Sequence, residues 1–465
     1  MTSDLVGTTD DLVVRNGTVF TPGGLREADV HVTDGVITSL ELGGESGKEE
    51  VDAKGLLVLP GGVDAHVHSR DPGFPEKEDF ASLTAAAAAG GITTVADMPN
   101  TVPAVENATV FMEKVEMVSP RALVDFALWG LLGTASRPED VHGLLDVGAV
   151  GLKAFLGYAI RRSNRQLVYT PDTADPDLEA PAGYGAIARL APDLARRGAP
   201  LAVHCEDADV LRAFRRPIST YADLLASRPG LAEAVAIAAL GVISQRTGME
   251  VNVVHISSGL GLAAARDADR AGARLVLETC PQYLLLSDQD AERLGPLLKM
   301  YPPVRTAADR AALLEGLRSG QISRVGTDHA PHTDGERLGR SLEEALPGSP
   351  GVETLYVSCL ELARRQGDLA AAVRWVAEGP ARGLGLHPRK GVIEPGADAD
   401  LTLVDPAAET VVTAERMHSR QRHTALEGQR FGFAVRAVYS RGELVGRDGE
   451  PVQRPGRARL VVPVR

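Results

Sequence analysis

Short runs of apolar residues alternate with longer helix-compatible stretches through the middle of the chain. The helix-compatible stretches include residues 80–89, 224–247 and 307–317. Strands that alternate with helices pair in parallel through right-handed crossovers. Eight such units predict an α/β fold of the closed (β/α)8 type, a TIM-like barrel. The apolar runs cover about residues 63–68, 93–98, 124–131, 150–156, 201–205, 251–256, 274–279 and 324–328.

The two ends of the chain follow a different pattern. Residues 11–58 and about 388–465 alternate apolar and polar positions between Gly and Asp turns, which is typical of antiparallel strands. We therefore expect one small β-sandwich domain built from both chain ends. The predicted boundaries are 1–58 for its N-terminal part, 59–387 for the barrel and 388–465 for its C-terminal part.

Two further stretches, 157–185 and 329–351, are rich in Pro, Gly and charged residues. Long loops in compact domains are often functional, so both are predicted to act as lids over one end of the barrel.

Composition narrows the class of protein. A chain of 465 residues suits one barrel plus a small accessory unit. The excess of 62 acidic over 49 basic residues, a formal net charge of -13, disfavours a nucleic-acid partner. The three cysteines form no CxxC pair, and the N-terminal residues lack the pattern of a signal peptide. We expect a cytoplasmic protein with no membrane partner.

The most informative positions are His66 and His68, which end an apolar run. Residues i and i+2 of a strand point to the same side, so the two imidazoles form half of a metal site. A single histidine is more often a surface or core residue than a ligand, but the placement repeats along the chain. Four more potential ligands end apolar runs of their own: Lys153, His204, His255 and Asp328. Because barrel strands end at one face, we expect a single shared site.

Lys153 is the unusual member of this set. An ammonium group is a poor ligand, and burying it unpaired in an apolar strand is costly. A carbamate formed with CO2, giving N6-carboxylysine, resolves both problems because its two oxygens can bridge two divalent cations. His66, His68 and Asp328 would complete one shell, and His204 and His255 the other.

Nitrogen and oxygen ligands without thiolate suit two Zn2+ ions, with Mn2+ or Co2+ as alternatives. Two such metals can share a water, lower its pKa and polarise a carbonyl. Asp328 is then the candidate catalytic group, which takes a proton and passes it to a leaving nitrogen.

A competing motif is the glycine pattern Gly259-Leu260-Gly261-Leu262-Ala263-Ala264, with Glu278 ending the next run. It is similar to a dinucleotide fingerprint, which would make the chain a nicotinamide-dependent oxidoreductase. Its place late in an eight-unit rhythm, directly after His255, favours an ordinary strand-to-helix turn instead. Neither a GxSxG elbow nor a GxxxxGK[ST] loop is present.

The HVH, LK and TDH motifs and the lone histidines, taken together, resemble the cyclic amidohydrolases: dihydroorotase, hydantoinase (dihydropyrimidinase) and allantoinase. The likeness runs from DLVVRNGTVF to GADADLTLVDP. The segments 68–73, 98–101, 327–332 and 350–354 look like dihydroorotase. That resemblance implies that Arg70, Asn100 and His332 hold a ring carboxylate of the substrate.

Other segments resemble hydantoinase or allantoinase instead. These are ETCPQYLLL at 278–286, KMYPPVR at 299–305 and Tyr158, five residues after Lys153. The resemblance implies that Tyr158 donates to the developing oxyanion. Structural roles stay open as well, because Tyr158 could only pack in its loop, Arg70 could pair with Asp71 or Glu78, and Asn100 could only cap a turn.

The resemblance implies a binuclear zinc hydrolase of cyclic amides. Its leading form is dihydroorotase, a pyrimidine-biosynthesis enzyme that interconverts dihydroorotate and N-carbamoyl-L-aspartate. The alternative is a hydantoinase, dihydropyrimidinase or allantoinase-like ureide hydrolase. A non-catalytic relative that serves as an oligomeric scaffold is a third class, which the filled ligand positions disfavour. Relatives are commonly dimers or tetramers, so a homo-oligomer is expected.

Overall fold

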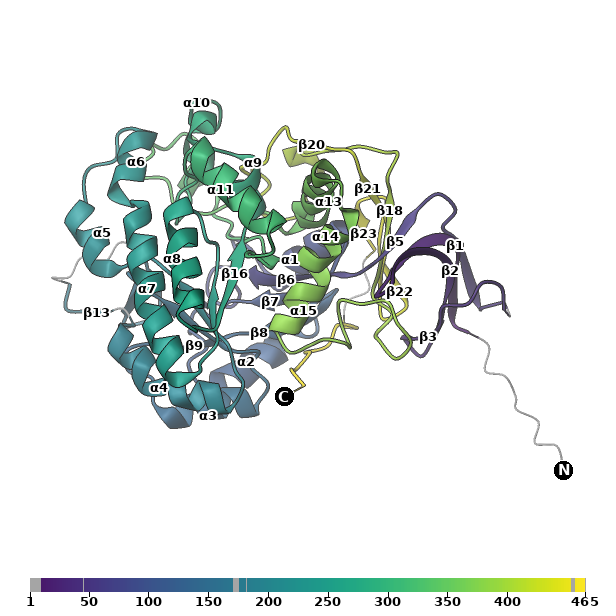
Figure 1. Ribbon diagram of the computed structural model, residues 1–465, viewed down its shortest axis with the longest axis horizontal. Helices are drawn as coiled ribbons and strands as arrows, with labels where there is room; N and C mark the ends of the chain where they lie inside the picture. Colours follow the sequence, from purple (N-terminus) through teal and green to yellow (C-terminus); the bar gives the residue numbers. More distant parts are fainter. Residues whose placement is uncertain (1–9, 45, 170–174, 181, 453–455, 465) are drawn as a thin grey trace.

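The structure is a computed structural model that describes residues 10–44, 46–169, 175–180, 182–452 and 456–464 (Figure 1). Expectations about the first nine residues, and about residues 170–174 and 181 of the first predicted lid, lie outside the described residues.

The apolar runs of the central region form parallel strands, as predicted. One parallel sheet contains β6 (Gly62–Val67), β7 (Ile92–Asp97) and β8 (Asp125–Leu128). The predicted strand 124–131 is divided around Trp129, and its second half, β9, begins the other parallel sheet. That sheet contains β9 (Gly130–Leu131), β10 (Leu152–Phe155), β14 (Leu201–His204), β15 (Val251–Val253), β16 (Leu275–Thr279) and β17 (Arg324–Val325).

The two parallel sheets approach each other at both ends. On one side Val150 donates its N–H to the Leu128 carbonyl at 3.0 Å. On the other side His68 donates to the His329 carbonyl at 2.8 Å, beside an isolated bridge between Val67 and His329. Within the described residues the strand ladder is not continuous, so the α/β class is confirmed but closure of the predicted barrel is not.

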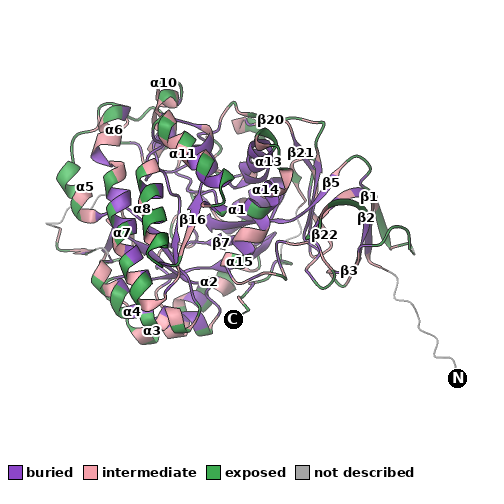
Figure 2. Cartoon of the chain, in the orientation of Figure 1, coloured by how far each residue is buried: buried purple, intermediate pink, exposed green. Residues whose placement is uncertain are grey.

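Helices cover the outer side of these strands, and Figure 2 shows buried inner strands beneath helices with exposed outer faces. The helix predicted at 80–89 is α1 (Phe80–Ala89), and that predicted at 307–317 is α11 (Ala307–Arg318). The stretch predicted as one helix at 224–247 is interrupted at Pro229. The reason is steric, because the residue before a proline avoids helical geometry. The remaining long helices are α2 (Ala108–Val118), α3 (Pro138–Asp146), α4 (Tyr184–Arg196), α5 (Ala208–Phe214), α6 (Tyr221–Ser227), α7 (Gly230–Thr247), α8 (Gly259–Arg270) and α13 (Leu355–Gln366).

The segment Tyr221–Thr247 is long and apolar enough to cross a membrane by length and composition alone. It contains α6 and α7, and α7 packs against α4 and α8. In its most apolar window, 39% of the residues are buried within the protein.

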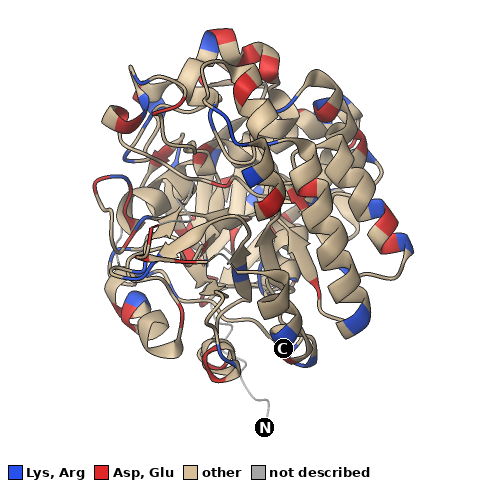
Figure 3. Cartoon of the chain, turned by 90° about the vertical axis from the view of Figure 1, so that its left-hand side faces the viewer, with Lys and Arg blue, Asp and Glu red and all other residues tan. Residues whose placement is uncertain are grey.

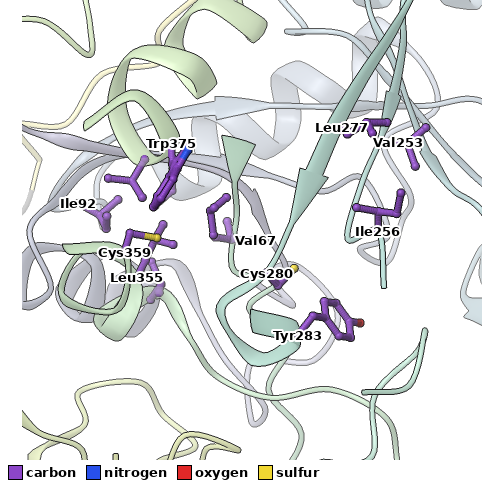
Figure 4. Close-up of a cluster of buried hydrophobic side chains, with 14 of the residues drawn as sticks. Val67, Ile92, Val253, Ile256, Leu277, Cys280, Tyr283, Leu355, Cys359 and Trp375 are labelled. Atoms are coloured by element: carbon purple, nitrogen blue, oxygen red, sulfur yellow. The ribbon is translucent and has the colours of Figure 1, made fainter. Parts of the chain in front are cut away.

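Residues on the outer side of the strands fill the space between strands and helices. Figure 4 shows Val67 beside Leu355 and Cys359 of α13 and beside Trp375. Val67 lies between His66 and His68 in sequence, and successive strand residues point to opposite faces. Anchoring of Val67 in this core therefore turns both histidines toward the inside of the strand layer.

Strands from both chain ends form one nine-stranded sheet, shown at the right of Figure 1. The sequence predicted one small β-sandwich from both chain ends, and the sandwich arrangement stays a prediction. The strands of the two ends join in one sheet because β5 pairs in parallel with β1 and antiparallel with β18. The division of the chain after residues 58 and 387 stays a prediction. The strands are β1 (Leu12–Thr21), β2 (Gly24–Thr33), β3 (Val36–Ser39), β4 (Glu49–Asp52), β5 (Leu57–Pro60), β18 (Leu401–Asp405), β21 (Ala434–Ser440), β22 (Glu443–Arg447) and β23 (Glu450–Pro451).

Candidate metal centre

Four histidines and one aspartate meet at the carboxyl ends of the inner strands. The Nε2 atoms of His66 and His68 lie 3.2 Å and 3.0 Å from Oδ1 of Asp328. His204 Nδ1 lies 3.0 Å from His255 Nε2. The potential ligand atoms of His66, His255 and Asp328 all lie within 4.8 Å of one another. The two predicted groups of ligands are thus adjacent, and His66 and His255 join them.

Three of the four imidazoles are oriented by an oxygen on the nitrogen that faces away from the cluster. Glu278 Oε1 lies 3.1 Å from His66 Nδ1, and Asn100 Oδ1 lies 2.6 Å from His68 Nδ1. Glu206 Oε2 lies 2.8 Å from His204 Nε2. An acceptor on one ring nitrogen places the proton there and leaves the lone pair of the other nitrogen for a metal.

Lys153 is fully buried on β10, and its Nζ has no hydrogen-bond partner among the described residues. Burial lowers the pKa of Lys153 to about 8, although the carboxylates of Asp328 and Glu278 oppose the shift. After burial, the charge of Lys153 is the next-largest factor that lowers the pKa of His66, so the two groups are close. Lys153 Nζ lies 4.9 Å from the centre of the Phe155 ring. A buried amine with no hydrogen-bond partner in the described part of the chain, near the imidazoles of His66, His204 and His255, fits a carbamate that binds metal.

The charge states of the cluster suit metal binding. Burial lowers the pKa of all four histidines, which keeps them neutral and able to donate a lone pair. Burial alone would raise the pKa of Asp328, but His66 and His68 hold it well below its usual range. The donor set is therefore neutral imidazole and ionised carboxylate, which divalent zinc prefers.

Three residues of this region have a strained backbone. His255, Asp328 and Arg70 have φ values of 43°, 50° and 60°, in the left-handed region that L-residues rarely adopt. Each such residue costs about 1–3 kcal/mol. Five other non-glycine residues among those described, including Arg165 and Arg441, share this geometry, so the strain is not confined to the site.

A cavity of about 720 Å³ lies beside the cluster. Arg70, Asn100 and His332, the predicted substrate residues, all line it. Asn100 also holds His68, so this residue links the cavity to the cluster. Tyr158 is buried with its ring 4.5 Å from that of His204, and burial raises the pKa of its hydroxyl well above the ordinary value.

Arg70 is buried without a carboxylate within 4.0 Å among the described residues. Its Nε donates to the Pro331 carbonyl at 3.2 Å and its Nη1 to the Tyr169 hydroxyl at 3.2 Å. His332 Nε2 lies 3.3 Å from Arg70 Nη2 and 3.0 Å from the Pro347 carbonyl. Since the carbonyl needs a donor, His332 Nε2 carries the proton there and offers no lone pair to Arg70. One edge of the guanidinium is thus left for a ligand.

The second predicted lid, residues 329–351, is fastened to the segment before it. Arg337 is buried, and its Nη1 donates to the Lys299 carbonyl at 3.1 Å and to the Leu346 carbonyl at 2.7 Å. Opening or closing of this loop stays a prediction.

The glycine pattern after β15 has a structural explanation. Glu233 accepts hydrogen bonds from the backbone N–H groups of Ser257 and Ser258 at 2.8 Å and 2.9 Å. A Cβ on Gly261 would lie 2.5 Å from Glu233 Oε2. The buried carboxylate fills the position at the start of α8 that a pyrophosphate would need, so the dinucleotide interpretation is wrong.

Sequence analysis missed the residues that orient the ligands, chiefly Glu206 and Glu278. Their positions could have indicated this role. Glu206 is two residues after His204, and Glu278, which was considered only with the glycine pattern, is the penultimate residue of β16. Arg228, which pairs with Glu206 at 2.6 Å, gave no sequence signal, because only the three-dimensional fold brings it there.

Comparisons with known proteins agree with this arrangement. A model of the amidohydrolase family matches residues 57–445. An allantoinase of Rubrobacter xylanophilus is 36% identical over 98% of this chain and 98% of the relative. A dihydroorotase of Methanothermobacter thermautotrophicus is 32% identical over 92% of this chain and 93% of the relative. The solved L-hydantoinase (dihydropyrimidinase) of Arthrobacter aurescens has a TM-score of 0.90 and 28% identity, covering 98% of this chain and all of that one.

Proposed function

The chain belongs to the amidohydrolase family, and from that premise we propose that it is a two-metal hydrolase that opens a cyclic ureide ring. The observation that carries the proposal is the buried Nζ of Lys153, which has no hydrogen-bond partner among the described residues, together with four imidazoles whose inner nitrogens converge. In this proposal the inner strands form a closed (β/α)8 barrel, like those implied by the family.

His66, His68 and Asp328 would hold one metal, His204 and His255 the other, and carboxylated Lys153 would bridge them. Zinc is the proposed metal, with Mn2+ or Co2+ as alternatives, because imidazole nitrogens and carboxylate oxygens suit these divalent cations. When bound, the two cations would acidify a shared water and polarise a carbonyl.

The remaining chemistry belongs to side chains. Oδ1 of Asp328 faces the Nε2 atoms of His66 and His68. Its other oxygen, Oδ2, would take the proton of the attacking water and deliver it to the ring nitrogen as the C–N bond breaks. Tyr158, beside His204, would donate to the carbonyl oxygen as its negative charge develops.

For the substrate we propose allantoin or a hydantoin in preference to dihydroorotate. The relative named allantoinase is 36% identical to this chain, and the relative named dihydroorotase is 32% identical. The similar solved structure is named L-hydantoinase. The hydantoinase-like Tyr158 supports the same choice. Dihydroorotate stays the second candidate, because Arg70 has an edge free for a carboxylate.

We also propose a cytoplasmic homo-oligomer that binds a small molecule rather than a macromolecule. In the view of Figure 3, acidic and basic residues are interspersed over the outer helices and loops. This distribution suits a solvated surface better than a phosphate-binding face.

A substrate panel tests the proposal. Zinc-loaded protein is assayed with allantoin, hydantoin, dihydrouracil and dihydroorotate, and a chelator-treated sample serves as control. The proposal expects the highest kcat/KM for allantoin or hydantoin and loss of activity with chelator. Activity that survives metal removal, or no hydrolysis of any of the four rings, would refute it.

A further inference from the structure

Arg228 lies in the break between α6 and α7 and touches both the metal centre and the cavity. The residue is 5% exposed, and it lines the cavity that contains Arg70 and Asn100. The following Pro229 takes its backbone out of helical geometry, and Arg305 Nη1 fixes its carbonyl with a 2.8 Å hydrogen bond. Its position is therefore set by the fold rather than by its side-chain partners.

One edge of the Arg228 guanidinium binds Glu206. Nε donates to Oε1 and Oε2 at 3.1 Å and 3.2 Å, and Nη2 donates to Oε2 at 2.6 Å. Both oxygens of Glu206 therefore accept from Arg228, a side chain that can only donate, so neither oxygen is placed to act as a donor.

The acceptor role of Glu206 matters for His204. Oε2 of Glu206, which already accepts from Arg228, lies 2.8 Å from His204 Nε2 and accepts there as well. The proton of the imidazole is therefore on Nε2, and Nδ1, which faces His255, keeps its lone pair.

The other side of Arg228 belongs to the cavity. Its guanidinium carbon lies 3.6 Å from the centre of the Tyr301 ring, a cation–π contact that holds the plane of the group. The contacts with Glu206 use Nε and Nη2, so Nη1 is the nitrogen that does not bind Glu206, and the guanidinium is also a hydrogen-bond partner of the Tyr301 hydroxyl. Lys299, also buried, lines the same wall.

We propose that Arg228 is a positioning residue for His204, acting through Glu206, and that its Nη1 edge binds a carbonyl or carboxylate oxygen of the substrate or ring-opened product. Arg228 would then bind the molecule in the cavity and also orient His204, the ligand of the second metal. This inference rests on the proposed function, because it takes His204 as a metal ligand.

The first test measures metal affinity in Glu206→Gln, Arg228→Gln and the double variant. Co2+ is titrated into metal-free protein, with visible absorption and equilibrium dialysis as readouts. Each single variant should lower the affinity for the second bound Co2+ by roughly 10–100-fold, the usual cost of losing a group that orients a ligand. The affinity for the first Co2+ should stay unchanged. The double variant should lose no more than the worse single variant, because both substitutions break one chain of contacts.

Two further variants guard against simple misfolding. Arg228→Lys keeps the charge without the fork and should fall between the unaltered protein and Arg228→Gln. Arg337→Gln also removes a buried arginine, but Arg337 Nη1 and Nη2 bind backbone carbonyls of Lys299 and Pro296, so the second Co2+ should bind normally. If Arg337→Gln lost as much affinity for the second Co2+ as Arg228→Gln, general destabilisation would explain the effect, and the inference would be overturned.

The second test measures the cavity side at saturating Co2+. N-carbamoylglycine, the ring-opened form of hydantoin, is titrated by calorimetry. Arg228→Gln should weaken its binding roughly tenfold, the value of one charged hydrogen bond, and Glu206→Gln should weaken it less. Additive metal losses in the double variant, or equal product binding in the two single variants, would overturn the inference. Failure of the unaltered protein to bind two metals or open any ring would instead refute the proposed function.

Discussion

Replacement of Lys153 gives the sharpest prediction about the metal centre. CO2 reacts with neutral amine only, and burial lowers the pKa of Lys153 to about 8 from an ordinary 10.5. At pH 7 that shift raises the neutral fraction from about 0.03% to about 10%, roughly 300-fold. The structure thus supplies the form of the side chain that carboxylation requires, at the position where two metals need a bridge.

The assay is 13C NMR of metal-loaded protein prepared with 13C-bicarbonate. We expect one carbamate resonance, its loss in Lys153→Arg, and loss of at least one metal equivalent in Lys153→Ala. Short carboxylic acids should restore part of the activity of Lys153→Ala, because they can occupy the space of the carbamate.

Lys299 provides a matched control. Burial also lowers its pKa to about 8, but its Nζ donates to the Glu343 carbonyl at 2.9 Å and contacts none of the candidate ligands. Lys299→Arg should therefore keep the carbamate resonance. If Lys153→Ala kept both metals and full activity, or if the resonance belonged to Lys299, the bridging role of Lys153 would be refuted.

Three other predictions concern proton transfer, substrate charge and pH. Asp328→Asn should lower kcat roughly 10²–10⁴-fold while much of the metal stays bound, and unchanged turnover would remove Asp328 from the reaction. Arg70→Ala should raise KM for dihydroorotate about tenfold or more and change KM for hydantoin little; equal effects on both would exclude a carboxylate contact. His418 hydrogen-bonds Glu353 and Glu450, which raises its pKa from 6.5 to about 9. Protonated His418 stabilises the fold fully below about pH 6.5, and this stabilisation is lost as the pH rises through about 9. The difference in Tm between the unaltered protein and His418→Gln should therefore shrink over that range.

Much of the fold could be predicted from the chain because strands and helices have distinct apolar periods. The run before His66 and the helix at Phe80–Ala89 are clear cases. The single sheet at the chain ends was not predictable, because β5 joins strands more than 300 residues apart and no local pattern records that pairing. The break at Pro229 follows from local sterics and could have been predicted.

The candidate ligands were predictable because each lies in or just after an apolar run. The four histidines and Asp328 lie at or just beyond the carboxyl ends of their strands, whereas Lys153 is the second residue of β10. The groups that orient the ligands were only partly predictable. Glu206 and Glu278 also lie near strand ends, whereas Arg228 reaches Glu206 from a separate helical segment. Asn100 illustrates a different limit: the resemblance assigned it to substrate, and the structure places its oxygen on His68 as well. The type and sequence position of a residue thus predict where its side chain lies in the fold better than they predict which group it hydrogen-bonds.

The central claim is that the chain, with metal bound, opens allantoin or a hydantoin in preference to dihydroorotate, and a competition experiment tests it most directly. Equal concentrations of allantoin and dihydroorotate are incubated with the zinc-loaded protein, and the ring-opened products are followed together by NMR. The account predicts that allantoate accumulates first and that chelator stops its formation. Faster formation of N-carbamoylaspartate, or opening of either ring without metal, would contradict the account.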